Sequence, residues 1–72
     1  MGSNLNRRDK ALSAIKEATN IYRELARAHP EPFMPSLAQS LNVLTSVLRS
    51  LGRRTEASAA QAEAEELGRL QN

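Results

Sequence analysis

Apolar residues recur at helical spacing in three stretches of the chain, and this pattern predicts an all-α fold. In the first stretch they follow at steps of three and four, which places on one helical face Ala11, Ile15, Ala18, Tyr22 and Leu25. They predict a helix over residues 7–28, with Asn6 or Asn4 as its N-cap. The stripe is widened by Leu12, Ala14 and Ile21. A helix apolar over so much of its circumference is expected to have neighbours on two sides.

A proline-rich segment separates the first stretch from the second. Residues 29–32 read HPEP, and Pro35 follows. Because proline lacks an amide hydrogen and restricts the residue before it, this segment predicts a stiff, non-helical connector. A second helix is expected to begin near Pro35, since proline suits the first helical position. It is expected to close at Gly52, because glycine adopts the left-handed conformation readily. Between these ends runs a leucine seam, formed by Leu37, Leu41, Leu44, Leu48 and Leu51.

The third stretch predicts a helix over residues 53–69. Its inward face combines small residues with one leucine, namely Ala57, Ala60, Ala64 and Leu67. Because the turn at Gly52 is so short, the second and third helices are expected to form an antiparallel hairpin. Small alanines on one helix and large leucines on the other would let the two backbones approach closely.

A near-duplication links the first stretch to the third. Residues 5–11 read LNRRDKA, and residues 51–57, which lie 46 positions later, read LGRRTEA. Over residues 5–26, 8 of 22 positions match the residue 46 positions further on, and several of these lie on the packing face. A unit that recurs at a fixed spacing is typical of a helical repeat array, in which each copy packs on the next.

The hairpin of the second and third helices resembles a tetratricopeptide repeat. The residues that match the family are Leu41, Leu44 and Leu48 for its large residues, Gly52 for its loop glycine, and Ala57 and Ala64 for its small residues. The resemblance implies a three-helix fragment of an α-solenoid over residues 5–72, in the order second helix, first helix, second helix, with antiparallel hairpins. The spacing of 46 residues departs from the usual repeat of about 34 and indicates a long-repeat variant.

The order of the helices predicts a fragment cut within a repeat. The missing first helix would cover Ile15 and Tyr22, and an open apolar face on a small domain favours self-association. A symmetric homodimer, with or without swapped helices, is therefore predicted. The alanine-rich third helix, acidic on its outer side, suits a terminal capping repeat and indicates a C-terminal fragment of an array. Residues 1–4 are expected to be a tag remnant or a disordered tail.

Composition narrows the classes of function. The chain has no cysteine, which excludes disulfides and cysteine metal sites and fits a cytoplasmic protein. No apolar run approaches the ~20 residues that span a bilayer, so no membrane partner is expected. The net charge of +2 is too weak to indicate a nucleic-acid partner by itself. Aromatic residues make up only 3 %, so the core is expected to be aliphatic.

No residue pattern indicates catalysis. The lone histidine, His29, has no second histidine or cysteine with which to hold a metal. The serines lack a G-x-S-x-G setting; they are Ser36, Ser40, Ser46, Ser50 and Ser58. The cluster of Glu63, Glu65 and Glu66 is better interpreted as a solvated helix face than as a metal site. The chain is therefore expected to be no enzyme and to hold no cofactor and no metal.

Two arginine pairs recur at equivalent helix starts, Arg7-Arg8 and Arg53-Arg54. They indicate a role in the turn or in capping the carbonyls of the preceding helix. The more specific functional alternative is that these arginines contact nucleic acid. A helix-turn-helix DNA binder is disfavoured, because the turn at Gly52 is tight and the third helix is acidic where a recognition helix is basic.

One polar stripe suggests a binding function. It steps by three, four and three along the second helix and consists of Gln39, Asn42, Ser46 and Arg49. The family resemblance implies that this helix lines a groove whose polar residues hold an extended peptide; an ordinary solvent-facing stripe is an equally good interpretation. The sequence thus predicts a non-enzymatic protein–protein interaction or scaffold module that binds protein or peptide. The alternative is a homo-oligomerisation unit that self-associates through the half-repeat face at Ile15 and Tyr22.

Overall fold

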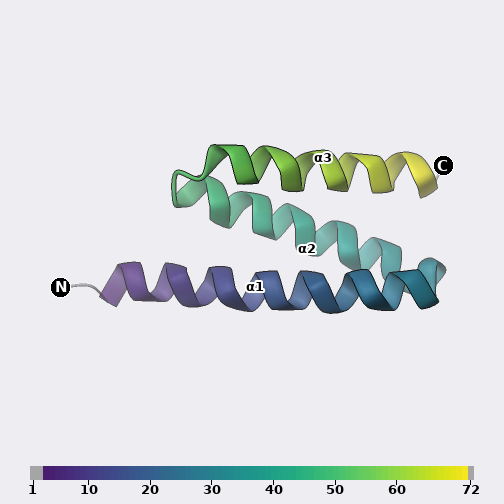
Figure 1. Cartoon of the computed structure of the whole chain (residues 1–72), viewed down its shortest axis with the longest axis horizontal. Coiled ribbons are helices and arrows are strands. Elements are labelled where there is room, and N and C mark those ends of the chain that lie inside the picture. Colours follow the sequence, from purple (N-terminus) through teal and green to yellow (C-terminus); the bar gives the residue numbers. More distant parts are fainter. Residues whose placement is uncertain (1–2, 72) are drawn as a thin grey trace.

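Three helices account for almost the whole chain. The computed structural model describes the backbone of residues 3–71 and the side chains of residues 7–70. The helices are α1 (Ser3–Ala28), α2 (Pro30–Ser50) and α3 (Arg54–Gln71). In Figure 1 the chain runs out along α1, returns along α2 and runs out again along α3. The all-α prediction is confirmed.

The middle helix holds the molecule together. α2 packs along α1 on one side and along α3 on the other, and no backbone contact joins α1 to α3 within the described residues. The described chain measures 45 × 19 × 12 Å, so it is elongated along the helices and thinnest in one of the two directions across them. The three helices therefore form an open, shallow layer and not a closed three-helix bundle.

The first helix begins earlier than the sequence predicted. It starts at Ser3 and not at residue 7, so Asn4 and Asn6 lie inside the helix and the predicted N-cap is wrong. Of the expected tail, residues 1–2 lie outside the described part of the chain, whereas residues 3–4 belong to α1. The predicted end at Ala28 is confirmed.

The proline-rich connector is the largest departure from prediction. Only His29 is non-helical, with φ −139° and ψ 80°, and α2 begins directly at Pro30. Pro30 and Pro32 fall in the first turn, where backbone amides have no partner within the helix, so their missing donors are not needed. Pro35 lies inside the helix, where its ring takes the place of one backbone hydrogen bond.

The turn between α2 and α3 forms as predicted, on the left-handed conformation of one glycine. Gly52 has φ +80°. Its amide donates to the carbonyl of Arg49 at 3.0 Å, and the amide of Arg53 donates to the carbonyl of Leu48 at 2.8 Å. This pair of bonds is a Schellman motif, which satisfies the last carbonyls of α2 and lets α3 start two residues after the glycine.

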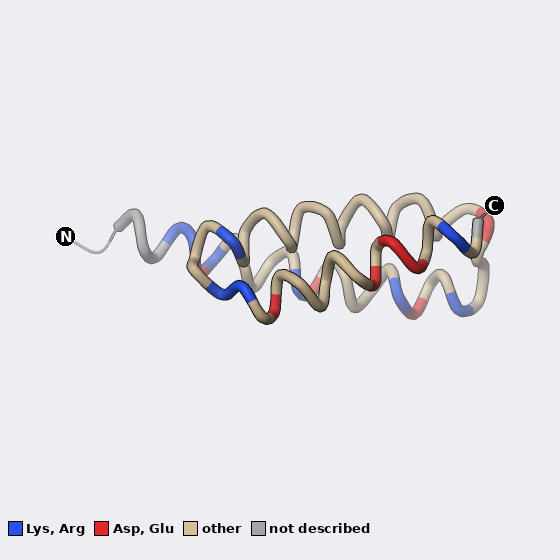
Figure 2. The backbone as a smooth tube through the Cα atoms, turned by 90° about the horizontal axis from the view of Figure 1, so that it is seen from above, with Lys and Arg blue, Asp and Glu red and all other residues tan. Residues whose placement is uncertain are grey.

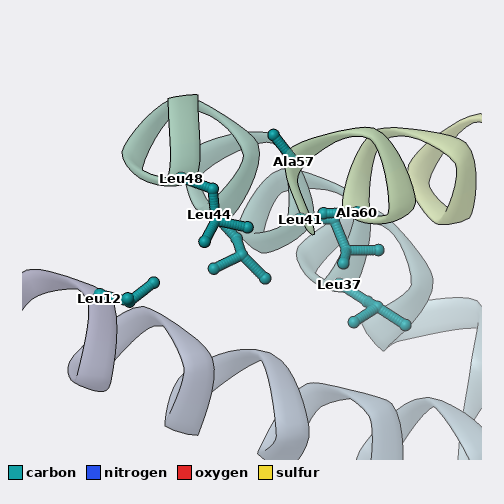
Figure 3. Close-up of a cluster of buried hydrophobic side chains, with 7 residues drawn as sticks. All are labelled: Leu12, Leu37, Leu41, Leu44, Leu48, Ala57 and Ala60. Atoms are coloured by element: carbon teal, nitrogen blue, oxygen red, sulfur yellow. The ribbon is translucent and has the colours of Figure 1, made fainter. Parts of the chain in front are cut away.

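The leucine seam of α2 builds the core, as predicted. Figure 3 shows the buried cluster, which consists of Leu12, Leu37, Leu41, Leu44, Leu48, Ala57 and Ala60. Leu41 is fully buried and Leu48 is 2 % exposed. The inward face predicted for the third helix is confirmed, since Ala64 and Leu67 pack against the same cluster.

The packing face of α1 is centred one position away from the predicted one. Ala11 is exposed, whereas Leu12 and Thr19 are buried. A buried threonine was not expected, but its hydroxyl donates to the carbonyl of Ile15 at 2.6 Å and so avoids an unpaired polar group. Thr45 on α2 is satisfied in the same way by the carbonyl of Leu41, at 2.8 Å.

Candidate interaction surfaces

The polar stripe of α2 lies on the surface. Its members, Gln39, Asn42, Ser46 and Arg49, are all exposed, on the part of α2 that faces away from the leucine seam. The two ends of the stripe have different neighbours. Gln39 borders a shallow hollow between α1 and α2, whereas Arg49 lies beside the start of α3. The stripe is therefore accessible along its whole length, but it is not one enclosed groove.

Arg49 already has a partner within the chain. One of its Nη atoms donates to Oε1 of Gln61 on α3 at 2.8 Å, and Nε2 of Gln61 donates to Oε2 of Glu65 at 3.4 Å. Arg49 and Arg54 also line a hollow of about 420 Å³ together with Ala57 and Ser58. A carboxylate that bound Arg49 would therefore compete with an exposed amide, which is a weak competitor.

Ile15 and Tyr22, the residues predicted for self-association, point toward α2. Both are half-buried and pack against the core cluster. They line a hollow of about 240 Å³ whose other wall comes from α2, with Ser36, Gln39, Ser40 and Val43. The structure thus brings Ile15, Tyr22 and Gln39 together at one junction, although the sequence analysis assigned them to separate surfaces.

A second apolar face of α1 escaped the sequence analysis as a site. It consists of Ala14, Ala18, Ile21 and Leu25, and we call it the outer stripe. Ile21 is 54 % exposed and, with Leu25, borders a hollow of about 340 Å³ whose other lining residues are Asn20 and Glu24. The sequence did contain a signal for this face, because a helix with apolar residues over so much of its circumference is expected to have a neighbour on a second side.

Two ion pairs bridge α1 and α3 over the leucine seam. Arg23 donates from Nε and an Nη atom to the two carboxylate oxygens of Glu63, at 2.9 and 2.7 Å. Nζ of Lys16 lies 3.8 Å from Oε1 of Glu56. Leu44 lies in the hollow that all four charged residues line. Glu63 was expected on the solvated face of the third helix; its side chain is 37 % exposed, but its carboxylate is bound by Arg23, a partner that the sequence analysis did not predict.

The Arg23–Glu63 pair perturbs both ionisation equilibria. Hydrogen bonding to Arg23 is the main reason that the pKa of Glu63 is lowered from its usual 4.5, with a smaller opposing effect of burial. The same hydrogen bonding raises the pKa of Arg23. Both side chains remain more than a third exposed, so solvent screens much of this interaction.

Basic residues gather at one end of the molecule. Figure 2 shows Lys and Arg at the end that holds the first turns of α1 and the turn between α2 and α3, while carboxylates are more frequent along the later part of α3. Of the two arginine pairs, Arg53 is engaged locally, with Nη1 3.7 Å from Oε2 of Glu56. The chain therefore has a charge asymmetry along its length that the net charge of +2 hides.

The described residues show no constellation for metal chemistry. No group of three or more His, Asp or Glu side chains in the part of the chain that the structure covers is placed to hold a metal ion. His29 is exposed at the junction of α1 and α2. Within the same residues, no helix is both long enough and apolar enough to cross a membrane.

Comparison with known proteins gives no match: no family model, no curated protein and no solved structure corresponds to this chain. The resemblance to tetratricopeptide repeats therefore rests on sequence alone, namely on the leucines of α2, Gly52 and the alanines of α3. The candidate surfaces are the polar stripe of α2, the junction at Ile15 and Tyr22, and the outer stripe of α1.

Proposed function

We propose that the chain is a non-enzymatic protein–protein interaction or scaffold module, built as a fragment of a tetratricopeptide-like α-solenoid. In this arrangement α1 and α3 are second helices of successive repeats and α2 is the first helix of the later repeat, paired with α3 in an antiparallel hairpin. The partner is a protein or peptide, in a cytoplasmic setting, and neither nucleic acid, membrane nor cofactor takes part.

The observation that supports this proposal is the open layer. Among the described residues, the backbone of α2 contacts both outer helices while the backbones of α1 and α3 contact only α2, as in neighbouring units of a stacked array. Such a layer leaves broad surfaces free for a partner.

A quantitative pull-down tests the proposal. The chain and the double variant Asn42→Ala/Arg49→Ala are immobilised at equal density, with Glu66→Gln, an exposed change on α3, as the control. We expect a protein partner that the control retains and the double variant loses. Equal capture by all three forms would argue against the polar stripe, and reaction of the chain with a small-molecule substrate would argue against a non-enzymatic role.

Homo-oligomerisation is the second candidate function, and the exposed apolar side chains favour it. Ile21 is 54 % exposed, Val43 46 % and Leu70 69 %. Light scattering coupled to size-exclusion chromatography distinguishes the candidates. A dimer that dissociates on dilution would support self-assembly through the α1 side of the molecule, including Ile15 and Tyr22. A monomer at the highest soluble concentration would remove this candidate.

A further inference from the structure

We infer that the outer stripe of α1 is the docking surface for a partner helix that carries a leucine seam like that of α2. This inference rests on the proposed interaction function and names the chemistry of the partner. The four residues of the stripe follow at steps of four, three and four, so they share one helical face. That face lies roughly a third of a turn around α1 from the face that packs on α2.

The occupant follows from the correspondence between α1 and α3. Residues 46 positions after the first three members of the outer stripe are Ala60, Ala64 and Leu67. Those residues form the stripe by which α3 packs into the core cluster, with Ala60 only 6 % exposed. On α3 this order of small, small and large side chains is buried or half-buried against the core cluster. On α1, Ala18 is half-buried while Ala14 and Ile21 are exposed.

The leucine seam of α2 is what covers the stripe of α3. Its members Leu37, Leu41 and Leu44 belong to the same buried cluster as Ala60. Small side chains on one helix let a leucine-bearing helix approach closely, and the branched Ile21 of the outer stripe corresponds to Leu67 in volume and position. By this equivalence, the outer stripe fits a helix with leucines at steps of three and four.

Charges beside the stripe add a second constraint on the partner. On α3, Glu56 and Glu63 are seven residues apart and pair with Lys16 and Arg23 of α1. The residues 46 positions earlier are Lys10 and Glu17, which are exposed and form no ion pair among the described residues. In this chain the paired bases lie on α1, which precedes the leucine-seam helix α2. A complementary partner therefore brings an acid opposite Lys10 and a base opposite Glu17, on the helix that precedes its leucine-seam helix.

A second copy of the chain satisfies these constraints poorly. Its own leucine seam is already buried between α1 and α3. An antiparallel pairing of two outer stripes would set Ala18 against Ile21 of the other copy, which is sterically favourable. The same pairing would bring Glu17 near the other copy's Glu24 on the same flank, and the two like charges would repel. A partner with its own uncovered leucine-seam helix is the better fit.

The test uses the full chain and a synthetic peptide of residues 30–52, which carries the leucine seam of α2. Amide chemical shifts of the isotope-labelled chain are followed while the peptide is added. We expect saturable shifts at Ala14, Ala18, Ile21 and Leu25, and at least a tenfold weaker affinity for the variant Ile21→Glu. Val43→Glu, which changes an exposed apolar residue on α2, is the matched control and should bind like the unchanged chain.

Two further arms keep the test decisive. A peptide in which the residues at positions 37, 41 and 44 are glutamine leaves the protein untouched and should not bind, so the result does not depend on the folding of any variant. Absence of binding by the unaltered peptide, shifts confined to α3, or shifts that depend on the concentration of the chain alone would each overturn the inference. A partner that binds through the polar stripe of α2 while the peptide fails would leave the proposed function intact.

Discussion

A substitution at Gly52 measures the effect of backbone conformation on stability without a change in side-chain packing. A Cβ added at this glycine meets no atom within 4 Å, so Gly52→Ala introduces no clash. Its φ of +80° nevertheless lies in the left-handed region, which costs an L-residue roughly 1–2 kcal/mol. Part of this is offset, since alanine restricts the unfolded chain by about 0.4–1 kcal/mol. We therefore expect Gly52→Ala to lose about 1 kcal/mol of the free energy of unfolding.

The matched control is Gly68→Ala, the same substitution at a helical glycine of α3. A Cβ there also meets no atom within 4 Å. Because alanine has the higher helix propensity, this variant should gain about 0.5–1 kcal/mol, and less if the end of α3 frays. Urea unfolding followed by far-UV circular dichroism measures both. Each kcal/mol corresponds to about 4–8 °C in Tm for a domain of this size. Shifts of the same sign in the two variants would refute the reasoning.

Three further predictions follow from the core, the ion pair and the prolines. Leu41→Ala should lose about 2–5 kcal/mol in urea unfolding, because Leu41 is fully buried, whereas Leu70→Ala, at a residue 69 % exposed, should change stability little. Glu63→Gln should lose less than about 1 kcal/mol near neutral pH. Because the folded-state pKa of Glu63 is lowered, the difference in unfolding free energy between the two forms should be present above pH 4.5 and vanish as the pH falls through the folded-state pKa. A difference that stays constant across a pH series of unfolding curves would contradict this prediction. Pro35→Ala should raise Tm, because it restores a backbone hydrogen bond inside α2. Pro30→Ala, at the first helical position, should not raise Tm. Equal effects of the two substitutions in thermal melts would argue against the assigned start of α2.

The leucine seam and the turn were within reach of the sequence because both are local signals. Leucines at steps of three and four specify one buried face wherever the neighbours lie, and Gly52 marks a left-handed residue on its own. The start of α2 was missed because a proline can either end the preceding helix or occupy the first position of the next one. Pro30 occupies the first position of α2, and His29 is the non-helical residue between the two helices.

The departures on α1 have a tertiary origin. Thr19 belongs to the packing face because its hydroxyl bonds a carbonyl one turn back, which a hydropathy pattern cannot register. The bridge from Arg23 to Glu63 joins residues 40 positions apart, and the partner of Arg49 on α3 is likewise set by how two helices pack. The exposure of the polar stripe followed from its periodicity, whereas its local partners depended on the assembled fold.

The central position of α2 has a consequence for how the protein folds. Each backbone contact between helices joins neighbours along the chain, α1 with α2 or α2 with α3, so loop closure is entropically cheap and folding is expected to be rapid. We expect an outer helix to open locally more readily than α2, which is packed on both sides. Amide hydrogen exchange should therefore be slowest in the middle of α2 and faster in α1 and α3, a gradient of opening free energies within a chain of 72 residues.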